Sequence, residues 1–317
     1  MKILDEKKLK FTVAVCTYNR FYLLDKSLKS LCSQNYPSKY FEILVIDNNS
    51  TDLTKTVTKK IMKDYPEINI RYKFEAKQGI SYASNTALKS AKYPIVIFLD
   101  DDEIASKNFL INYNKVWSKY GTSKVGSVGG KIGPWFENKI AKDLYNKHKN
   151  LVGSWVFGII DLGKKELILE DKLSLLAGNF SLNKEIVLSL GGFDTKIGVK
   201  KWPFYIQGDD IELCLRLKKF GYYLIYSPKI IVKNFVPVCR FNKRYLLRRY
   251  FLSSIEMQYV DKKIFGRKYV LITSLNLIKK HIRYFYRFIS FRKSVFNPFQ
   301  VIWDITYTIQ TILTILK

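Results

Sequence analysis

The sequence predicts an α/β fold, with a mainly parallel central sheet flanked by helices and a helical extension after it. In the first hundred residues, short apolar runs alternate with segments whose apolar residues recur at helical spacing. One run, residues 95–99, is apolar throughout, which is typical of a strand buried on both faces. A strand–helix–strand order with right-handed crossovers gives a parallel sheet. We expect strands at residues 11–16, 41–46, 68–74 and 95–99, with helices at residues 22–34, 52–65 and 80–90.

The pattern is less regular after residue 106. The segment 209–220 is the best defined, because Asp209 suits an N-cap, Glu212 stands three residues on, and Gly221 follows as a terminating glycine. The other expected elements are helices at 108–120 and 184–190, strands at 124–131, 174–182, 222–226 and 230–235, and a hairpin at 155–170 that turns at Gly163.

The composition changes beyond Pro237, so we expect an α/β domain at residues 1–238 and a basic, aromatic helical region at 239–317. The chain has 54 lysines and arginines against 27 acids, a formal net charge of +27, and the tail has 16 against three. This excess indicates an anionic partner such as a phosphorylated substrate, anionic lipid or nucleic acid. Lysines scattered over solvated faces explain part of it equally well.

The cysteine and histidine content excludes a zinc site of the usual kind. Four cysteines form no CxxC pair, and only two histidines occur. Buried, reduced thiols suit a reducing cytosol. The polar start has no signal-peptide core, and no uninterrupted apolar stretch of about 20 residues is present. We therefore expect a cytoplasmic protein.

Three polar loops follow predicted parallel strands, at residues 17–20, 47–50 and 100–102. Ligands of such sheets bind beyond the carboxyl ends of the strands. In extended chain, Asp100 and Asp102 point to one side and Asp101 to the other. Two carboxylates so placed can hold Mg²⁺ or Mn²⁺, and such an ion would bridge phosphates and stabilise a departing diphosphate. A solvated acidic turn is the alternative interpretation.

Two further acidic positions have both structural and chemical explanations. Asp47 could accept a hydrogen bond from a base imino group, while Ser50 could cap the next helix. Asp209 could cap a helix, and Asp210, in its first turn, could either favour the helix dipole or act as a general base. Glu212 and Arg216 are spaced to pair along the same helix.

Taken together, seven stretches resemble the family 2 glycosyltransferases of GT-A fold. They occur in family order over about residues 10–235: VAVCTYNR (13–20), EILVIDNNSTD (42–52), GISYASNTAL (79–88), IVIFLDDDE (95–103), AGNFSLNKE (177–185), GGFDTKIG (191–198) and QGDDIELCLRLKKFGY (207–222). The resemblance implies an inverting transfer of a sugar from a nucleotide diphosphate sugar, with a UDP-sugar favoured, to a hydroxyl of a saccharide or lipid-linked glycan. It also implies a nucleotide-binding half at about 10–105, an acceptor half at about 106–238, and a place in cell-surface polysaccharide or glycoconjugate synthesis.

The resemblance also assigns roles to residues, with Asp210 as the catalytic base. Asp102 and Asp100 match the metal positions. The expected nucleotide contacts are Thr17, Tyr18, Asn19, Arg20, Asp47, Asn85, Asp100 and Asp101, and the expected acceptor contacts are Gly178, Asn179, Trp202 and Asp209. Trp202 could stack on a sugar or simply anchor its loop.

The sequence departs from the family pattern in two places. Ser84 stands where an arginine commonly precedes Asn85, so a basic nucleotide contact is missing or comes from Arg20 or Lys77. Asn234 stands where a histidine often precedes the Val-Pro step, which puts a third protein ligand for the metal in doubt.

The tail allows two interpretations. Basic and aromatic residues interleave between residues 268 and 291, as on helices that lie on anionic membranes. Residues 299–316 are apolar but include Asp304 and Gln310, which favours an interfacial or oligomer contact over a spanning helix. We expect peripheral contact with the inner face of the plasma membrane. The alternative is that these helices pack back on the α/β domain.

Two other functions fit parts of the sequence. The net charge alone would suit a nucleic-acid-binding protein. No recognised binding module occurs, and the basic residues lie beside a sheet edge rich in acids, so we expect no nucleic-acid partner. A non-catalytic sugar-nucleotide-binding relative is the other alternative, and the joint presence of Asp100, Asp102 and Asp210 argues against it.

Overall fold

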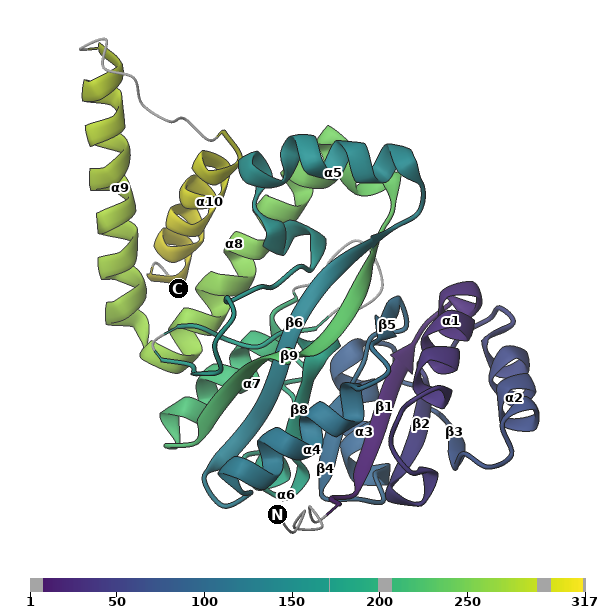
Figure 1. Ribbon diagram of the computed structural model, residues 1–317. Coiled ribbons are helices and arrows are strands. Elements are labelled where there is room, and N and C mark those ends of the chain that lie inside the picture. The colour runs from purple at the N-terminus through teal and green to yellow at the C-terminus, as the bar shows by residue number, and fades with distance from the viewer. Residues whose placement is uncertain (1–7, 171, 199–206, 290–297, 316–317) are drawn as a thin grey trace. The chain divides into compact units, whose positions relative to one another are not determined.

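The computed structural model describes residues 8–170, 172–198, 207–289 and 298–315, with side chains undescribed at 282–289, 298 and 314–315 (Figure 1). The chain divides into two compact units, and each is described by itself. The first comprises Met1–Trp135, Gly158–Phe204 and Asp209–Phe235. The second comprises Phe136–Phe157, Tyr205–Gly208 and Val236–Lys317.

The described strands form one mixed sheet, in the order β3-β2-β1-β4-β8-β6-β9-β5, with β7 beside β9. Strands β3, β2, β1 and β4 are parallel, and the pairs β4–β8, β8–β6, β5–β9 and β7–β9 are antiparallel. The strands are β1 Phe11–Thr17, β2 Phe41–Asp47, β3 Ile70–Phe74, β4 Ile95–Phe98, β5 Glu103–Ala105, β6 Val125–Phe136, β7 Leu167–Ile168, β8 Phe180–Asn183 and β9 Tyr223–Val236.

Helices cover the sheet or build the second unit. The α-helices are α1 Phe21–Cys32, α2 Thr54–Asp64, α3 Ile80–Ser90, α4 Phe109–Tyr120, α5 Lys139–Val152, α6 Lys184–Ser189, α7 Asp209–Lys219, α8 Lys243–Phe265, α9 Arg267–Ile289 and α10 Pro298–Ile315. Short 3-10 turns are η1 Ser38–Tyr40, η2 Ser154–Phe157, η3 Ala177–Asn179 and η4 Val238–Phe241.

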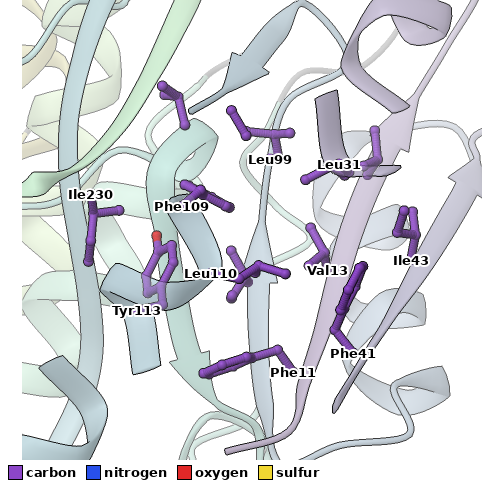
Figure 2. Close-up of a cluster of buried hydrophobic side chains, with 14 of the residues drawn as sticks. Phe11, Val13, Leu31, Phe41, Ile43, Leu99, Phe109, Leu110, Tyr113 and Ile230 are labelled. Atoms are coloured by element: carbon purple, nitrogen blue, oxygen red, sulfur yellow. The ribbon is translucent and has the colours of Figure 1, made fainter. Parts of the chain in front are cut away.

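The hydrophobic core lies on both faces of the sheet. Successive strand residues point to opposite faces, so Val13 of β1 joins the cluster packed by α1 and α4, while Ala14 joins the one packed by α3 and α7. Figure 2 shows the first cluster, in which Phe109 and Tyr113 of α4 meet the strand residues. Each fully buried large apolar side chain contributes about 1.5–3 kcal/mol. This two-sided burial fixes the strand ends that carry the polar loops.

The α/β prediction is confirmed, and the elements expected before residue 100 occur within a few residues of their expected bounds. The expected Trp155–Glu170 hairpin is wrong. Ser154–Phe157 forms a 3-10 turn, and Leu167–Ile168 pairs with β9. Likewise, the strand expected at 174–182 begins only at Phe180.

Two other elements differ from prediction. The strands expected at 222–226 and 230–235 are one strand, β9, although Pro228 lies within it. Helix α5 was not predicted; the side chain of Asn138 caps it by accepting a hydrogen bond from the Ala141 N–H at 3.0 Å.

The second unit joins 136–157 to the helical tail, whereas we placed the former in the acceptor half. The Tyr250 hydroxyl of α8 donates to the Val152 carbonyl at 2.5 Å, and the Arg240 guanidinium donates to the Phe157 carbonyl at 3.1 Å. Trp155 also packs against Tyr250 with ring centroids 5.0 Å apart. These contacts explain why the two segments form one unit although they are far apart in sequence.

Helices α8, α9 and α10 pack on one another in the second unit. Asp304 of α10 is buried and accepts hydrogen bonds from Lys280 Nζ at 2.8 Å and Gln300 Nε2 at 2.9 Å, with His281 Nε2 at 3.0 Å. The acid in this apolar helix is thus partnered inside the unit. None of the described helices combines the length and the hydropathy needed to cross a membrane.

Candidate active site

The ends of three adjacent parallel strands bring the predicted polar loops together. Thr17 ends β1 and lies in register with Asp47 at the end of β2, and the Asn48 N–H donates to the Thr17 carbonyl at 2.9 Å. On the other side of β1, the Thr17 hydroxyl donates to Asp101 Oδ2 at 2.8 Å. The sheet therefore assembles the three loops in the predicted place, around Thr17.

The acidic run after β4 continues for four residues, from Asp100 to Glu103. Asp100 is exposed, whereas Asp101, Asp102 and Glu103 are buried. The Asp102 carbonyl accepts hydrogen bonds from Trp135 Nε1 at 3.2 Å and the Phe235 N–H at 3.0 Å. Because these bonds attach the run to β6 and β9, its backbone position does not depend on its charged side chains.

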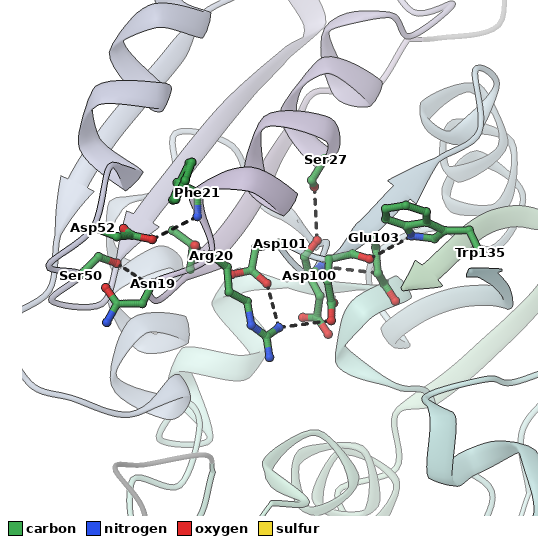
Figure 3. A network of polar contacts seen from close by, with 12 residues as sticks. Asn19, Arg20, Phe21, Ser27, Ser50, Asp52, Asp100, Asp101, Glu103 and Trp135 are labelled. Atoms are coloured by element: carbon green, nitrogen blue, oxygen red, sulfur yellow. Dashed lines mark hydrogen bonds and ion pairs between the residues drawn. The ribbon is translucent and has the colours of Figure 1, made fainter. Parts of the chain in front are cut away.

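Arg20, in the loop after β1, lies against this acidic run (Figure 3). Its Nη1 is 3.1 Å from Asp101 Oδ1 and 3.2 Å from Asp102 Oδ2. The Arg20 side chain is 48% exposed, whereas both carboxylates are 7% exposed. The pairing raises the pKa of Arg20, chiefly through the charge of Asp101.

The crowded carboxyl groups have raised pKa values. Desolvation, followed by the charges of Asp102 and Asp101, raises the pKa of Asp100 to about 8, even though its surface reaches solvent. Desolvation raises the pKa of Asp101 to about 6 against the opposing effect of Arg20. Burial and the charge of Asp100 raise the pKa of Glu103 well above its usual range. These carboxyl groups therefore hold their protons to higher pH than usual, because Arg20 offsets only part of the crowding and desolvation.

This surplus of carboxylate oxygen fits a hard divalent cation. Magnesium sites commonly use one or two carboxylates together with substrate phosphates, and Asp100 and Asp102 are the two that the extended chain directs to one side. Within the described ranges, no three His, Cys, Asp or Glu side chains are grouped so as to hold a metal by themselves.

The loop after β2 is ordered by contacts that the sequence only partly indicated. Asp47 is 2% exposed; its Oδ1 accepts from the Ser50 N–H at 2.9 Å and its Oδ2 from the Tyr72 hydroxyl at 2.6 Å. The Ser50 hydroxyl accepts from the Asn19 N–H at 3.0 Å and does not cap α2, so the predicted capping role is wrong. Asn19 adopts a φ of 52°, and Tyr18 beside it is exposed. Tyr18 and Asn19 therefore line the open side of this edge.

Asp209 and Asp210 begin α7, as predicted, and Asp209 is the first helical residue rather than a cap outside the helix. Asp210 is half-buried; its Oδ2 accepts from the Ala177 N–H at 3.0 Å, and its Oδ1 from the Ile211 N–H at 2.8 Å. Its charge also contributes to the raised pKa of Asp100. The fold therefore places Asp210 close enough to Asp100 for their charges to interact.

Gly178 and Asn179, two of the predicted acceptor contacts, make close contacts with other parts of the protein. A Cβ atom at Gly178 would overlap the Glu103 carboxylate, so only glycine fits there without a shift. Asn179 is 1% exposed; its Nδ2 donates to the carbonyls of Lys131 and Ile230, and its Oδ1 accepts from the Tyr113 hydroxyl. Asn179 thus joins α4, β6 and β9, and we interpret it as a positioning residue.

Asn85 is also engaged by the protein. Its Nδ2 donates to the Phe193 carbonyl at 2.9 Å, and its Oδ1 accepts from the Phe193 N–H at 2.8 Å. Ser84 is buried and hydrogen-bonded to Cys16, whose thiol pKa is raised mainly by burial. Asn85 thus clamps the loop at Phe193, and the nucleotide contact that we expected of it stays a prediction.

Trp202 lies outside the described residues. Asn234, which stands where the family often has a histidine, is buried on β9 opposite Glu103 of β5. Sequence reasoning gave no role to Glu103, Tyr72 or Trp135. Glu103 could have been noticed in the sequence as the fourth acid of the run. Tyr72 and Trp135 could not, because they reach the site from strands that are distant in sequence.

Comparison with known proteins agrees with this geometry. The model of "Glycosyl transferase family 2" matches residues 12–162. A dolichyl N-acetyl-alpha-D-glucosaminyl phosphate 3-beta-D-2,3-diacetamido-2,3-dideoxy-beta-D-glucuronosyltransferase of Methanococcus voltae is 27% identical over 225 residues, which are 69% of this chain and 65% of the relative. A GalNAc(5)-diNAcBac-PP-undecaprenol beta-1,3-glucosyltransferase of Campylobacter jejuni is 40% identical over 94 residues, 30% of each chain. The chain thus spans just under two thirds of the first relative's length and less than one third of the second's.

Solved structures show the same fold. The mannosyltransferase PcManGT from Pyrobaculum calidifontis, in complex with GDP-Man and Mn²⁺, superposes with a TM-score of 0.58 at 17% identity, covering 96% of this chain and 87% of that one. S. aureus TarS 1-349 in complex with UDP gives a TM-score of 0.54 at 18% identity, covering 78% and 65%. With its acidic run at the end of β4 and its Asp-Asp pair at the start of α7, the chain has the GT-A fold, and its residues 12–162 match glycosyltransferase family 2.

Proposed function

We propose that the protein is an inverting glycosyltransferase that moves a hexosyl or N-acetylhexosaminyl group from a nucleotide diphosphate sugar to a hydroxyl group. One observation carries the proposal. The acidic run and Asp210 come from distant parts of the sequence, yet the Ala177 N–H donates to the Asp210 carboxylate, and the next residue, Gly178, lies against the Glu103 carboxylate at the end of the run. A donor diphosphate and an attacking hydroxyl need these two kinds of carboxylate side by side.

Asp210 is suited to accept the proton of the acceptor hydroxyl. Two backbone N–H groups orient its carboxylate, those of Ala177 and Ile211. As the hydroxyl oxygen bonds to the anomeric carbon, its proton passes to Asp210, and the bond from that carbon to the diphosphate oxygen breaks. Attack and departure on opposite faces of the sugar invert the anomeric centre.

Asp100 and Asp102 would hold Mg²⁺ or Mn²⁺. The bound ion supplies positive charge to the diphosphate as it leaves. Two of the solved structures with this fold are named as complexes with Mn²⁺. The surplus of carboxylates around Asp100 is the feature of this chain that supports a cation.

The nucleotide is proposed to be a uridine diphosphate. Asp47 lies at the end of β2, and its Oδ1 and Oδ2 each accept one hydrogen bond, so a base imino group would share one of these oxygens. Support comes from TarS, whose structure contains UDP, although PcManGT, of the same fold, contains GDP-Man. A guanosine donor is therefore the alternative to test first.

A donor-panel assay tests the proposal. Release of nucleoside diphosphate would be measured from UDP- and GDP-sugars, with Mn²⁺ or with excess chelator, for the wild type and Asp102→Ala. We expect turnover of one donor class in Mn²⁺ and its loss in chelator and in the variant. Full turnover in chelator would remove the metal role. Donor binding without turnover, with every acceptor class supplied, would instead favour a non-catalytic sugar-nucleotide-binding relative.

We further propose a saccharide or lipid-linked acceptor reached at the cytoplasmic face of the membrane. The two curated relatives described above are named for dolichyl- and undecaprenol-linked substrates. In this chain, α9 exposes Leu271, Leu275 and Ile278 at helical spacing, and α10 exposes Ile305, Ile309 and Ile312 in the same way, each 41–50% exposed. Apolar stripes on a segment with 16 basic and three acidic residues match an anionic lipid surface.

Flotation with liposomes tests the membrane contact. We expect the full chain to float with anionic vesicles and to remain unbound with neutral ones. Leu275→Glu with Ile309→Glu should abolish flotation, whereas Leu53→Glu, at an equally exposed leucine of the first unit, should not. Loss on deletion of residues 264–317 is also required. Equal flotation of the stripe variant would reject this surface, and binding to RNA or DNA in a shift assay would support the nucleic-acid alternative.

A further inference from the structure

Arg20 lies against the carboxylates at which we propose that the metal ion binds. Both of its contacts, to Asp101 Oδ1 and Asp102 Oδ2, are made by one nitrogen, Nη1. Its five N–H donors form a planar fork that suits two oxygens of a carboxylate or a phosphate. The fork is thus only partly used, and the side chain reaches solvent.

Arg20 and a divalent cation would use the same carboxylate. Asp102 is one of the two residues that we propose for the metal, and its Oδ2 is 3.2 Å from Arg20. Two positive groups on one carboxylate repel each other and divide its negative charge. Asp101 has a second attachment in the Thr17 hydroxyl at 2.8 Å, so it remains held when Arg20 moves.

The backbone on both sides of Arg20 is fixed, which leaves the side chain as the moving part. The Asn19 N–H donates to Ser50 Oγ at 3.0 Å, and the Phe21 N–H donates to Asp52 Oδ2 at 3.2 Å. Arg20 itself stands at the head of α1 and makes no side-chain cap. A long, half-exposed side chain on a fixed backbone can turn when phosphate oxygens replace its carboxylate partners.

We propose that Arg20 couples nucleotide binding to metal binding by exchanging Asp102 for the donor diphosphate. With the diphosphate at this edge, the guanidinium transfers from the carboxylate to phosphate oxygens, and Asp102 is released to the cation. Arg20 thereby supplies the basic contact that Ser84 does not, and it holds back metal binding until nucleotide arrives. The inference rests on the proposed function, because it needs a nucleotide diphosphate and a divalent cation at this site.

Binding measurements on the full chain, rather than turnover, test the proposal. Free Mn²⁺ would be followed by electron paramagnetic resonance, without nucleotide and with saturating UDP or GDP, for wild type, Arg20→Gln and Arg20→Lys. We expect Arg20→Gln to bind Mn²⁺ alone about three- to tenfold more tightly. We expect the factor by which nucleotide strengthens Mn²⁺ binding to fall by a similar amount. Both values for Arg20→Lys should lie between those of the wild type and those of Arg20→Gln, because lysine keeps the charge but not the planar fork of donors.

Arg71→Gln is the matched control. Arg71 Nη1 pairs with the buried Glu42 at 3.0 Å, and its side chain is 43% exposed, close to the value for Arg20. Glu42 is in register with Thr12 near the start of β1, at the opposite end of the strands. Removing this charge should leave both Mn²⁺ affinities within twofold of the wild type.

The outcomes separate the two proposals. If nucleotide strengthens Mn²⁺ binding equally in wild type and Arg20→Gln, the coupling role is wrong and the proposed function stands. If Arg71→Gln changes the Mn²⁺ affinities as much as Arg20→Gln, the effect is one of net charge and the coupling role is again wrong. If the wild type shows no linkage between Mn²⁺ and either nucleotide, the metal part of the proposed function fails, and the role of Arg20 fails with it.

Discussion

Replacing Asp210 by asparagine separates the chemistry of this carboxylate from its part in the fold. Loss of a general base lowers the rate by about 10²–10⁴-fold, which is about 3–5 kcal/mol of activation free energy. The asparagine has one oxygen, so it can accept from either the Ala177 N–H at 3.0 Å or the Ile211 N–H at 2.8 Å, and not from both. Losing one charge-assisted hydrogen bond costs about 1.5–3 kcal/mol of stability.

This stability loss sets the conditions of the assay. For a chain of this size it corresponds to a fall in Tm of about 2–5 °C, so turnover should be measured at least 20 °C below the Tm of the variant. Nucleoside diphosphate release gives kcat, and calorimetry gives the affinity for UDP with Mn²⁺, which we expect to stay within about threefold. Asp161→Asn, at a half-exposed carboxylate that pairs with Lys131, is the control and should keep its turnover within twofold. Turnover of folded Asp210→Asn within about tenfold of the wild type would refute the base assignment.

Three further predictions concern stability. Asn179→Ala removes three hydrogen bonds, two of them buried, and should lower the free energy of unfolding in urea by about 3 kcal/mol. A loss below about 1 kcal/mol would contradict the positioning role of Asn179. Asn85→Ala should lower stability yet leave UDP affinity within threefold, and a tenfold loss of UDP affinity would contradict its role as a clamp. Asp101 has a pKa of about 6 in the folded chain and about 4 when unfolded. The folded chain therefore keeps a proton that the unfolded chain has lost, and stability without metal should fall by about 3 kcal/mol as pH rises through this window. Asp101→Asn should make that slope shallower, since Asp100 and Glu103 also have raised pKa values, and an unchanged slope would contradict the assignment.

The sequence predicted the loops at the carboxyl ends of the strands well, because the hydrophobic pattern that defines each strand is local and periodic. The apolar runs before Thr17, Asp47 and Asp100 are strands buried on both faces, and parallel order alone places their ends together. The place of Asp210 in the first turn of a helix was predictable, because the sequence has a clear helix N-terminus at Asp209. The prediction that Asp210 lies near Asp100 depended on the family resemblance, because no periodic pattern links segments so far apart in the sequence.

Other parts could not be predicted because tertiary partners decide them. Pro228 suggested a break, yet β9 continues through it, with Ile230 packed so closely on β6 that only glycine fits at residue 130. Asn85 and Asn179 carry polar side chains typical of ligand contacts, and only the fold shows that backbone groups already engage them. Helix α5 is amphipathic and lysine-rich, and it gains its burial from the second unit.

The contact between Gly178 and Glu103 constrains how this site can change through evolution. The glycine has no room for a Cβ because the glutamate carboxylate fills that space. Alanine at 178 would require either a shift of the Glu103 carboxylate or a shorter acid, such as aspartate, at 103. Related sequences should therefore carry alanine at 178 mainly together with a smaller residue at 103, and a library that varies both residues should recover this pair more often than alanine at 178 beside glutamate.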